Sequence, residues 1–363
     1  MATIPKARFW LALRSVPGIG DVTSRRLAER FGGPDRVLAA SSDALRRGGV
    51  RDDVAREIAV FSGWSEIDCE IERAERLGIE LLCLDDEGYP PALRFTHDPP
   101  PVLYVRGRLA AADVHAIAMV GSRKASAYGL AAAGRLARDL AAAGVTVVSG
   151  LALGIDAASH QGALDAGGRT LAVLGSGIDR IYPDRHRKLA ERIAAEGALL
   201  SEFPLGREPA AENFPRRNRI VSGLALGVVV VEAGDKSGSL ITARLALEQG
   251  REVLAVPGEI GLDRTRGTHR LLRQGARLVE SGADVVDDVM PWLARSSAPP
   301  PVPSLAADAS LVLGSFERPV EHVDRLIDKS GFSAARVLEI LFELELAGRV
   351  SRHPGMTFSK RLG

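Results

Sequence analysis

The sequence predicts an α/β protein. Its centre is a Rossmann-like, doubly wound and mostly parallel sheet, flanked by an N-terminal helical domain and a C-terminal winged-helix domain. Three observations lead to this prediction. Short apolar runs alternate with helical segments between residues 116 and 256. The runs at 171–174 (LAVL) and 228–231 (VVVV) are apolar throughout, as in parallel strands buried on both faces. Proline-rich segments separate this region from its flanks.

The proline-rich segments set the expected domain boundaries. Residues 297–304 (SAPPPVPS) predict a linker, because prolines fix an extended backbone and lack the hydrogen-bond donors that helices and sheets need. A softer boundary lies within 85–101, which contains five prolines. We therefore expect three domains: a helix-hairpin-helix or SAM-like domain at 1–85, an extended Rossmann-like domain at 86–296 and a winged-helix domain at 305–363.

The first domain is expected to be helical, most regularly at 67–77. Residues 13–31 predict a helix, a turn containing Gly18-Ile19-Gly20, and a second helix. In helix-hairpin-helix modules such a turn offers backbone amides to a DNA phosphate, and Arg25 and Arg26 follow one helical turn later. A simple helix–helix turn explains the pattern equally well, and the acidic excess over the first hundred residues favours it. Both interpretations stay open.

The middle domain should alternate strands and helices. Strands are expected at 116–120, 145–149, 170–174, 198–202, 227–231 and 252–256. Helices are expected at 128–143, 157–166, 186–196, 220–226 and 240–249. The carboxyl ends of parallel strands meet at one edge of the sheet, and open α/β sheets bind their ligands there.

The C-terminal segment predicts a helix-turn-helix with a β wing. The helices are expected at 320–329 and 333–347, and the wing at 349–358. The second helix carries Glu339, Glu343 and Glu345 against Arg336. A duplex backbone would repel such a helix, so a protein contact, or a folded module without a known partner, is favoured over DNA reading.

Composition limits the classes of function. A net charge of +1 over 363 residues argues against a uniformly basic protein, so any nucleic-acid surface must be local. Two cysteines, Cys69 and Cys83, provide neither a disulfide framework nor a zinc site and suit a reducing compartment. The sequence has no apolar signal region and no apolar run of about 18 residues. We expect a cytoplasmic protein without a membrane span, metal or cofactor.

Three Gly/Ser turns follow predicted strands at the ligand-binding edge. They offer backbone N–H groups and small side chains, and the last one opens a helix whose dipole favours an anion. The predicted anion-binding residues in these turns are Gly121, Ser122, Arg123, Ser176, Gly177, Lys236, Ser237, Gly238 and Ser239. Taken alone, Gly121 could merely turn the chain and Arg123 could be a solvated charge. Convergence of three such turns on one edge favours a functional surface.

An arginine-rich segment precedes the predicted helix at 220–226. We expect it to form a turn that holds phosphate through Arg216, Arg217, Asn218 and Arg219. Phe214 stands beside these arginines, where an exposed ring can stack on an unpaired base. Burial in the core is the equally weighted alternative for this ring.

Several catalytic patterns are missing. Neither the dinucleotide fingerprint nor the Walker loop follows the predicted strands, and no G-x-S-x-G elbow occurs. Asp156 and His160 are four residues apart and could share a helical face, but no nucleophile or third ligand has suitable spacing. We expect Asp156 to cap its helix and His160 to bond within the fold, and we predict no catalytic residue.

Six motifs resemble the DprA/Smf family of bacterial DNA-processing proteins. They are GSR at 121, SGLALGIDAASHQGAL at 149, LGSGIDRIYP at 174, LLSEFP at 199, NFPRRNRIVSGL at 213 and EAGDKSGSLITARLALEQGREVLAVPG at 232. Their order and spacing agree with the family across the middle domain. Departures include His186 and His269, where the family more often has asparagine.

The resemblance implies a non-enzymatic protein that binds and protects single-stranded DNA and loads the recombinase RecA during natural transformation and homologous recombination. It also implies a homodimer joined through the Rossmann-like domain. By position, a DNA groove would be lined by Ser122 and Arg123, by Phe214, Arg217 and Asn218, and by the turn 236–239.

Two other functions are compatible with parts of the pattern. The turn 234–239 occupies the place of the catalytic loop of nucleotide-hydrolysing phosphoribohydrolases, but no acidic residue follows Ser239 until Glu248. Alternatively, the middle domain could be a scaffold, with duplex DNA bound by the two flanking domains.

Overall fold

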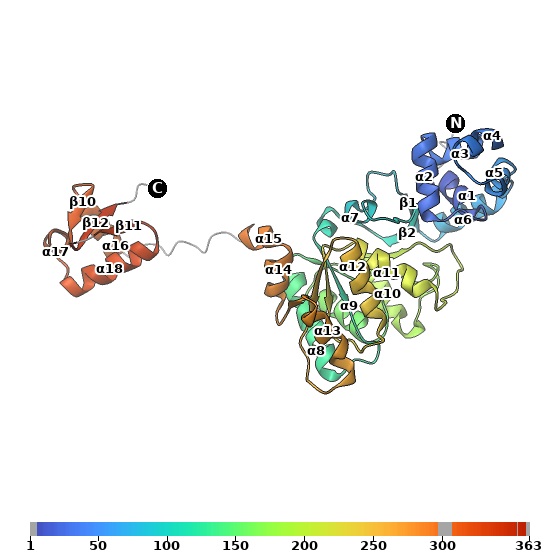
Figure 1. Ribbon diagram of the computed structural model, residues 1–363. Coiled ribbons are helices and arrows are strands. Elements are labelled where there is room, and N and C mark those ends of the chain that lie inside the picture. Colours follow the sequence, from blue (N-terminus) through green and yellow to red (C-terminus); the bar gives the residue numbers. More distant parts are fainter. Residues whose placement is uncertain (1–5, 297–306, 354, 361–363) are drawn as a thin grey trace. The chain divides into compact units, whose positions relative to one another are not determined.

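The computed structural model describes residues 6–296, 307–353 and 355–360. These form two compact units that divide after Pro291 (Figure 1). The expected linker at 297–304 lies outside the described residues. Among the helices that the structure describes, none combines the length and apolar character needed to cross a bilayer.

The first unit is built on a sheet of nine strands within the described residues. Its order is β1-β2-β6-β5-β4-β3-β7-β8-β9. Strands β3 to β9 are parallel, and β2 pairs antiparallel with both of its neighbours, β6 and β1. The strands are β1 Glu80–Cys83, β2 Val102–Gly107, β3 Ala116–Val120, β4 Thr146–Ser149, β5 Thr170–Val173, β6 Ala198–Ser201, β7 Gly227–Val230, β8 Glu252–Ala255 and β9 Arg277–Leu278. The predicted α/β class and mostly parallel sheet are therefore confirmed.

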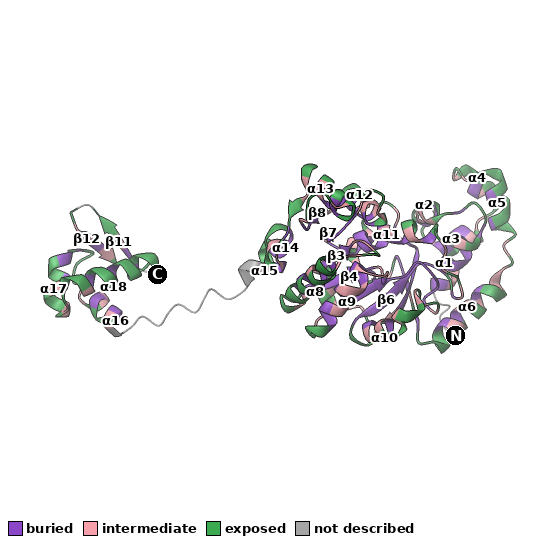
Figure 2. Ribbon diagram, turned by 90° about the horizontal axis from the view of Figure 1, so that it is seen from below, coloured by how far each residue is buried: buried purple, intermediate pink, exposed green. Residues whose placement is uncertain are grey.

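Helices cover both faces of this sheet, and the strands between them are buried (Figure 2). Those after β3 are α8 Ala127–Ala142, α9 Ile155–Asp165, α10 Arg187–Glu196, α11 Asn213–Gly223, α12 Gly238–Glu248, α13 Arg266–Arg273 and α14 Gly282–Val289. Short helices complete the set: α7 Pro91–Arg94, η1 Ala111–Val114, η2 Asp184–His186 and η3 Asp263–Thr265. Helix α15, Pro291–Ser296, begins at the boundary between the two units.

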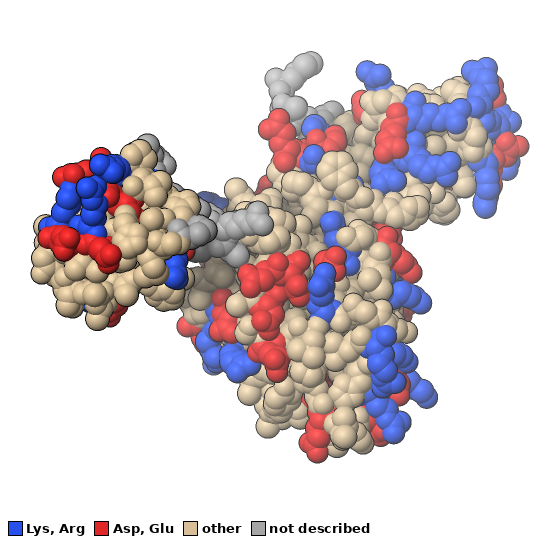
Figure 3. Space-filling view, turned by 60° about the vertical axis from the view of Figure 1, so that its left-hand side comes forward, with Lys and Arg blue, Asp and Glu red and all other residues tan. Residues whose placement is uncertain are grey.

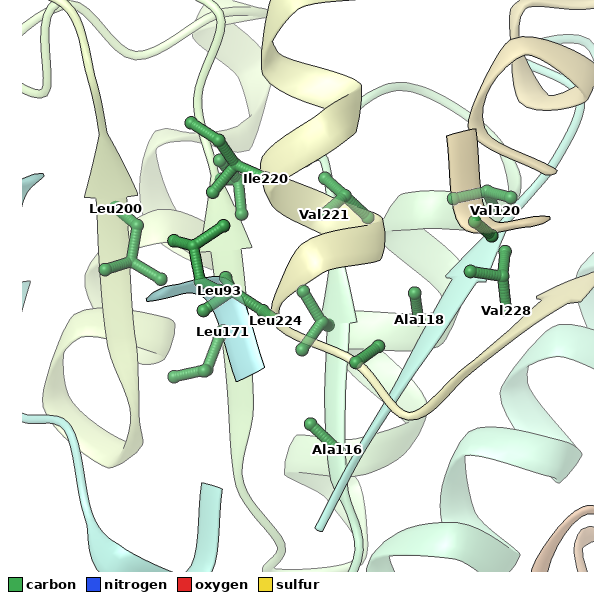
Figure 4. Packing of buried hydrophobic residues seen from close by; sticks show 14 of the residues in the cluster. Leu93, Ala116, Ala118, Val120, Leu171, Leu200, Ile220, Val221, Leu224 and Val228 are labelled. Carbon is green, nitrogen blue, oxygen red and sulfur yellow. The ribbon is translucent and has the colours of Figure 1, made fainter. Parts of the chain in front are cut away.

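Side chains that alternate along the strands contribute to two hydrophobic cores, one on each face of the sheet. On one face, Ala116, Ala118 and Val120 of β3 pack with Ile220 and Val221 of α11 (Figure 4). On the other, strand residues such as Ala172 and Leu199 pack with α10 and with the N-terminal helices. Because successive side chains of a strand point to opposite faces, the fully apolar runs in the sequence supply both cores.

The N-terminal segment is helical, as expected. Its helices are α1 Lys6–Ser15, α2 Asp21–Phe31, α3 Pro34–Ala39, α4 Ser42–Arg47, α5 Asp52–Ala59 and α6 Trp64–Arg76. They enclose a small core that includes Leu13, Val37 and Leu45. Side chains of α1 and α6, among them Trp10 and Ile71, also belong to the core beneath the sheet. This segment therefore shares part of its hydrophobic core with the Rossmann-like sheet.

The second unit has the order of a winged helix. It contains α16 Ala307–Gly314, β10 Val320–His322, α17 Val323–Ser330, α18 Ala334–Leu346, β11 Val350–His353 and β12 Thr357–Lys360. The three strands pair antiparallel in the order β10-β12-β11. One expected helix is corrected, because Val320–His322 pair with β12 as a strand and α17 begins only at Val323. The predicted winged helix is confirmed.

Candidate functional site

An open cavity of about 780 Å³ lies at the carboxyl ends of β3 and β7. These strands are neighbours in the sheet, and the chain order reverses between them, since β4, β5 and β6 follow on one side and β8 on the other. Ligands of open α/β sheets bind at such a switch point, so we call this space the switch-point cavity. Loops after both strands and the first turns of α11 and α12 line the cavity.

The loop after β3 is held by close backbone contacts. The Ser122 amide donates to the Glu232 carbonyl at 2.7 Å, and the Ile155 amide donates to the Ser122 carbonyl at 3.2 Å. A Cβ on Gly121 would lie 2.5 Å from Ile155 Cγ1, and one on Gly154, whose φ is +76°, would lie 2.2 Å from the Ser122 oxygen. Both positions therefore require glycine, and the tight packing directs Arg123 to the exposed rim.

The loop after β7 ends at the N-terminus of α12. Ser237 is the N-cap, and its hydroxyl lies 2.7 Å from that of Ser239. Lys236 precedes the cap, is exposed and forms no ion pair with a described residue. Lys236, Ser237, Gly238 and Ser239 all line the cavity, so a helix N-terminus and a free ammonium group face the same space.

The arginine-rich segment is not a turn. Residues 213–219 form the first two turns of α11, which the sequence pattern places only from 220 onward. Helical periodicity turns Asn213, Arg217 and Ile220 inward and leaves Arg216 on the surface. The expected turn is therefore corrected to a helix, in which Arg217 and Arg219 are both buried.

Arg217 is a buried residue in the floor of the cavity. Its Nη1 donates to the Val173 carbonyl at 2.6 Å, and the Asp156 carboxylate is close enough to favour its charged form. Burial lowers the pKa of Arg217 and raises the pKa of Asp156, and their mutual attraction opposes both shifts. This pair is a buried support for the site.

Arg219 belongs to an ion-pair network on the other side of α11. Its Nη2 lies 2.7 Å from Asp21 and 2.9 Å from Glu202, and its Nε lies 2.9 Å from Asp98. Burial raises the pKa of Glu202, and Arg219 opposes that shift. Arg216 approaches the same carboxylates at 3.5 Å and 3.8 Å from the surface. Neither arginine lines the cavity.

The same ion-pair network includes Asp21, the residue that directly follows the Gly18-Ile19-Gly20 turn. Asp21 occupies the first turn of α2, and its carboxylate pairs with Arg14 as well as Arg219. Arg25 donates to the Thr96 carbonyl at 3.2 Å and pairs with Glu29. A carboxylate already present at this helix N-terminus would repel a phosphate, which favours the simple helix–helix turn.

An aromatic ledge borders the cavity. The Arg123 guanidinium carbon lies 5.1 Å from the centre of the Phe214 ring, and the Tyr182 ring centre lies 6.0 Å from that of Phe214. Phe214 is half-buried, whereas Tyr182 is exposed. The Phe214 ring lies against Gly175, where a Cβ would approach its Cδ1 to 2.8 Å. This aromatic ledge, formed by Phe214 and Tyr182, therefore offers aromatic rings for stacking, and the Arg123 guanidinium beside it offers a positive charge.

Two cations of the cavity are not predicted by the sequence pattern. Lys124 and Arg264 line it together with Arg123 and Lys236, and none of the four forms an ion pair with a described residue. The full lining contains five basic side chains, counting Arg217, against Asp156 and Asp263. Asp263 is itself paired with Arg266 at 3.3 Å. The cavity consequently presents an excess of unpaired positive charge.

Asn218 completes the predicted residues that line the cavity, and its amide lies 3.5 Å from the Gly238 carbonyl. Ser176 and Gly177 lie elsewhere. The Ser176 hydroxyl donates to the Arg180 carbonyl at 2.6 Å, and the Gly177 amide donates to the Arg207 carbonyl at 2.8 Å. Their turn stabilises the loop that follows β5.

Asp156 and His160 have structural partners. Asp156 accepts bonds from the amides of Gly150 and Ala152 at 3.1 Å and 3.2 Å, so it holds the loop before α9 where a helix cap was expected. His160 bonds within the fold, as expected, with Nδ1 2.6 Å from the Thr170 hydroxyl. That hydroxyl donates to the Val147 carbonyl, so His160 Nδ1 must carry the proton. Burial lowers the pKa of His160 to about 3.

Comparison with known sequences identifies the family. Residues 80–290 match the family described as DNA recombination-mediator protein A, and residues 296–356 match the DprA winged helix domain. The chain belongs to the DprA/Smf family. DprA/Smf relatives include Protein Smf of Escherichia coli (strain K12), which is 39% identical over 95% of this chain and 94% of its own length.

Solved structures of DprA proteins share the fold. The X-ray structure of DNA processing protein A from Streptococcus pneumoniae has a TM-score of 0.58 and 33% identity, covering 75% of this chain and 98% of that one. A structure describing the single-stranded DNA binding mode of DNA processing protein A from Helicobacter pylori has a TM-score of 0.53 and 30% identity. It covers 58% of this chain and 96% of that one.

Proposed function

We propose that this DprA/Smf protein binds single-stranded DNA in the switch-point cavity. The observation that carries the proposal is the set of four unpaired cations around one open cavity, Arg123, Lys124, Lys236 and Arg264. Single-strand binding without sequence preference requires a positive groove for the backbone and aromatic faces for the bases. The ledge of Phe214 and Tyr182 supplies the second component. The H. pylori relative, whose structure describes single-stranded DNA binding, supports the assignment.

In this proposal the helix N-terminus and the cations hold phosphates, and Phe214 holds a base. Arg217 and Asn218 form part of the floor. Ser176 and Gly177 in the loop after β5, the exposed Arg216 and the buried Arg219 act on the structure of the site. No side chain of the cavity is assigned a role in bond cleavage.

Binding of a labelled oligo-dT strand tests the proposal. Arg123→Ala and Lys236→Ala should each weaken binding and flatten its salt dependence by about 0.7 in the log–log slope, the value for one phosphate contact on a single strand. The matched control is Arg244→Ala on the exposed side of α12, where Arg244 pairs with Glu248 at 3.6 Å and does not line the cavity. Unchanged affinity for the oligo-dT strand in both cavity variants would contradict the proposal.

A duplex of the same length, measured at two salt concentrations, separates the proposed function from duplex binding by the flanking domains. In a separate experiment the protein is incubated with nucleoside monophosphates. Release of free base from them would favour the phosphoribohydrolase alternative.

We further infer, from membership of the family, that the protein protects the bound strand and loads RecA on it during transformation and recombination, and that it acts as a homodimer. The RecA inference predicts a shorter lag in RecA ATPase activity on single strands covered by single-strand-binding protein. Sedimentation of the purified chain measures the dimer. Failure of either result would leave the DNA-binding proposal standing.

A further inference from the structure

Helix α18 of the winged-helix unit carries an apolar stripe on its outer side. Leu338, Phe342 and Leu346 are 39%, 61% and 74% exposed, and their spacing of four residues places them in one row. The opposite side of the helix supplies Val337, Ile340, Leu341 and Leu344 to the core of the unit. The stripe is therefore additional to the residues that fold this unit, and exposed rows of large apolar side chains mark interaction surfaces.

Acidic side chains border the stripe. On a helical projection Glu339 and Glu343 follow one flank and Glu345 the other. Glu343 and Glu345 form no ion pair with a described residue, and Arg336, the one basic residue of α18, is already engaged by Asp308 at 2.9 Å and Glu339 at 2.7 Å. Figure 3 shows acidic and basic side chains next to one another, beside uncharged surface, on one face of this unit.

The acidic and apolar surface of α18 lies on the helix that contacts DNA in many winged-helix proteins. In a winged helix the helix before the wing enters the major groove of duplex DNA. Here that helix presents carboxylates and hydrocarbon where guanidinium or amide groups would be needed to meet phosphates and base edges. The same geometry suits a helix of a protein, which can pack an apolar row against the stripe and place cations beside its flanks.

We propose that α18 is the docking site for an amphipathic helix of another protein, with an apolar row flanked by lysines or arginines. A second copy of α18 fits poorly, because a two-fold arrangement would bring the glutamates of both copies together. This inference is independent of DNA binding in the switch-point cavity.

Two synthetic helical peptides test the proposal with the full-length chain. Both carry leucines along one row, and their flanks carry lysines in one peptide and glutamates in the other. We expect fluorescence anisotropy to show salt-sensitive binding of the lysine peptide alone. Phe342→Ser should weaken this binding about tenfold, because the central anchor of the stripe is lost.

Further variants separate charge from packing. The double change Glu343→Lys and Glu345→Lys should reverse the preference between the two peptides. Val320→Ser, at an exposed apolar residue of β10 in the same unit, should leave binding unchanged. Circular dichroism should show unchanged folding, since all these positions are exposed.

Three results would overturn the inference. The first is equal binding of both peptides or binding of neither. The second is unchanged binding of the lysine peptide by Phe342→Ser. The third is self-association or duplex DNA binding that Phe342→Ser abolishes, because it would make a second copy or DNA the occupant of the stripe.

Discussion

At the scale of single residues, burial decides what each arginine of α11 does. Arg216, Arg217 and Arg219 stand within four positions. Arg216 is on the surface, Arg217 is buried in the cavity floor and Arg219 joins a buried ion-pair network. A guanidinium enclosed by carboxylates is committed to the fold. A guanidinium that faces solvent and forms no ion pair with a described residue, such as that of Arg123, remains available to a polyanion.

Phe214 gives a prediction about base stacking. Phe214→Leu retains apolar volume against Gly175 but removes the ring that borders Arg123 and Tyr182. We expect single-strand affinity to fall by roughly 1 to 3 kcal/mol with an unchanged salt slope, because no cation is lost. A Leu variant that instead alters the salt slope would show that the ring acts by positioning Arg123.

His160 gives a prediction about acid stability. Its pKa is about 3 in the folded protein against a usual value of 6.5, so the unfolded chain binds a proton that the folded chain excludes as the pH falls through this window. Unfolding free energy should therefore decrease by about 1.4 kcal/mol per pH unit from this group below pH 6.5, until about pH 3.

His160→Gln should remove that contribution, leaving a shallower decline between pH 6 and pH 4 in urea titrations. His97→Gln is the matched control, because His97 is exposed. Identical slopes for the two variants would contradict the assignment of the loss to His160.

At the scale of elements, the strands were predictable and the start of α11 was not. Each of the six expected strands forms within one residue of its predicted ends, because doubly buried strands require continuous apolar runs. Pro215 and the neighbouring arginines suggest a turn. A proline in the first helical turn is nevertheless compatible with a helix, since its missing N–H would have no partner there.

Strand β9 and the position of Arg264 could not be predicted from the local sequence. Strand β9 has two exposed residues and forms only by pairing with β8. Arg264 reaches the cavity from a loop after β8, so its place depends on the assembled sheet. Sequence motifs could predict the two loops after β3 and β7, whereas the complete set of cations required the tertiary structure.

The buried network gives a prediction for α11 as an element. Arg219→Ala leaves Glu202 and Asp21 without their closest cation, and the loss of one partner from a buried pair costs roughly 3 to 5 kcal/mol. Arg216→Ala, at the half-exposed neighbour, should cost less than about 1 kcal/mol. Chemical unfolding measures both values, and equal costs would refute the distinction.

At the scale of the whole molecule, the two units have separate hydrophobic cores. All residues of the switch-point cavity lie between positions 120 and 264, within the first unit. The winged helix contributes none of them, and its exposed stripe has a different chemistry. The proposed polyanion site and the exposed apolar stripe thus lie on separate folded units.

This separation predicts the result of truncation. A chain that ends after Pro291 should keep its single-strand affinity within about twofold, because the cavity and both supporting cores are intact. Anisotropy with the oligo-dT strand measures the affinity. A large loss would move part of the DNA-binding surface to the second unit.

Helix α11 faces the cavity with Phe214 and Asn218 and the buried network with Arg219. The partners of that network include Asp21 and Arg14 of the N-terminal helices. The residues of α11 that line the cavity and the residue that contacts the N-terminal helices thus belong to one helix. We therefore expect an oligo-dT strand bound in the proposed site to slow hydrogen exchange at the amides of α1 and α2, although no residue of these two helices lines the cavity.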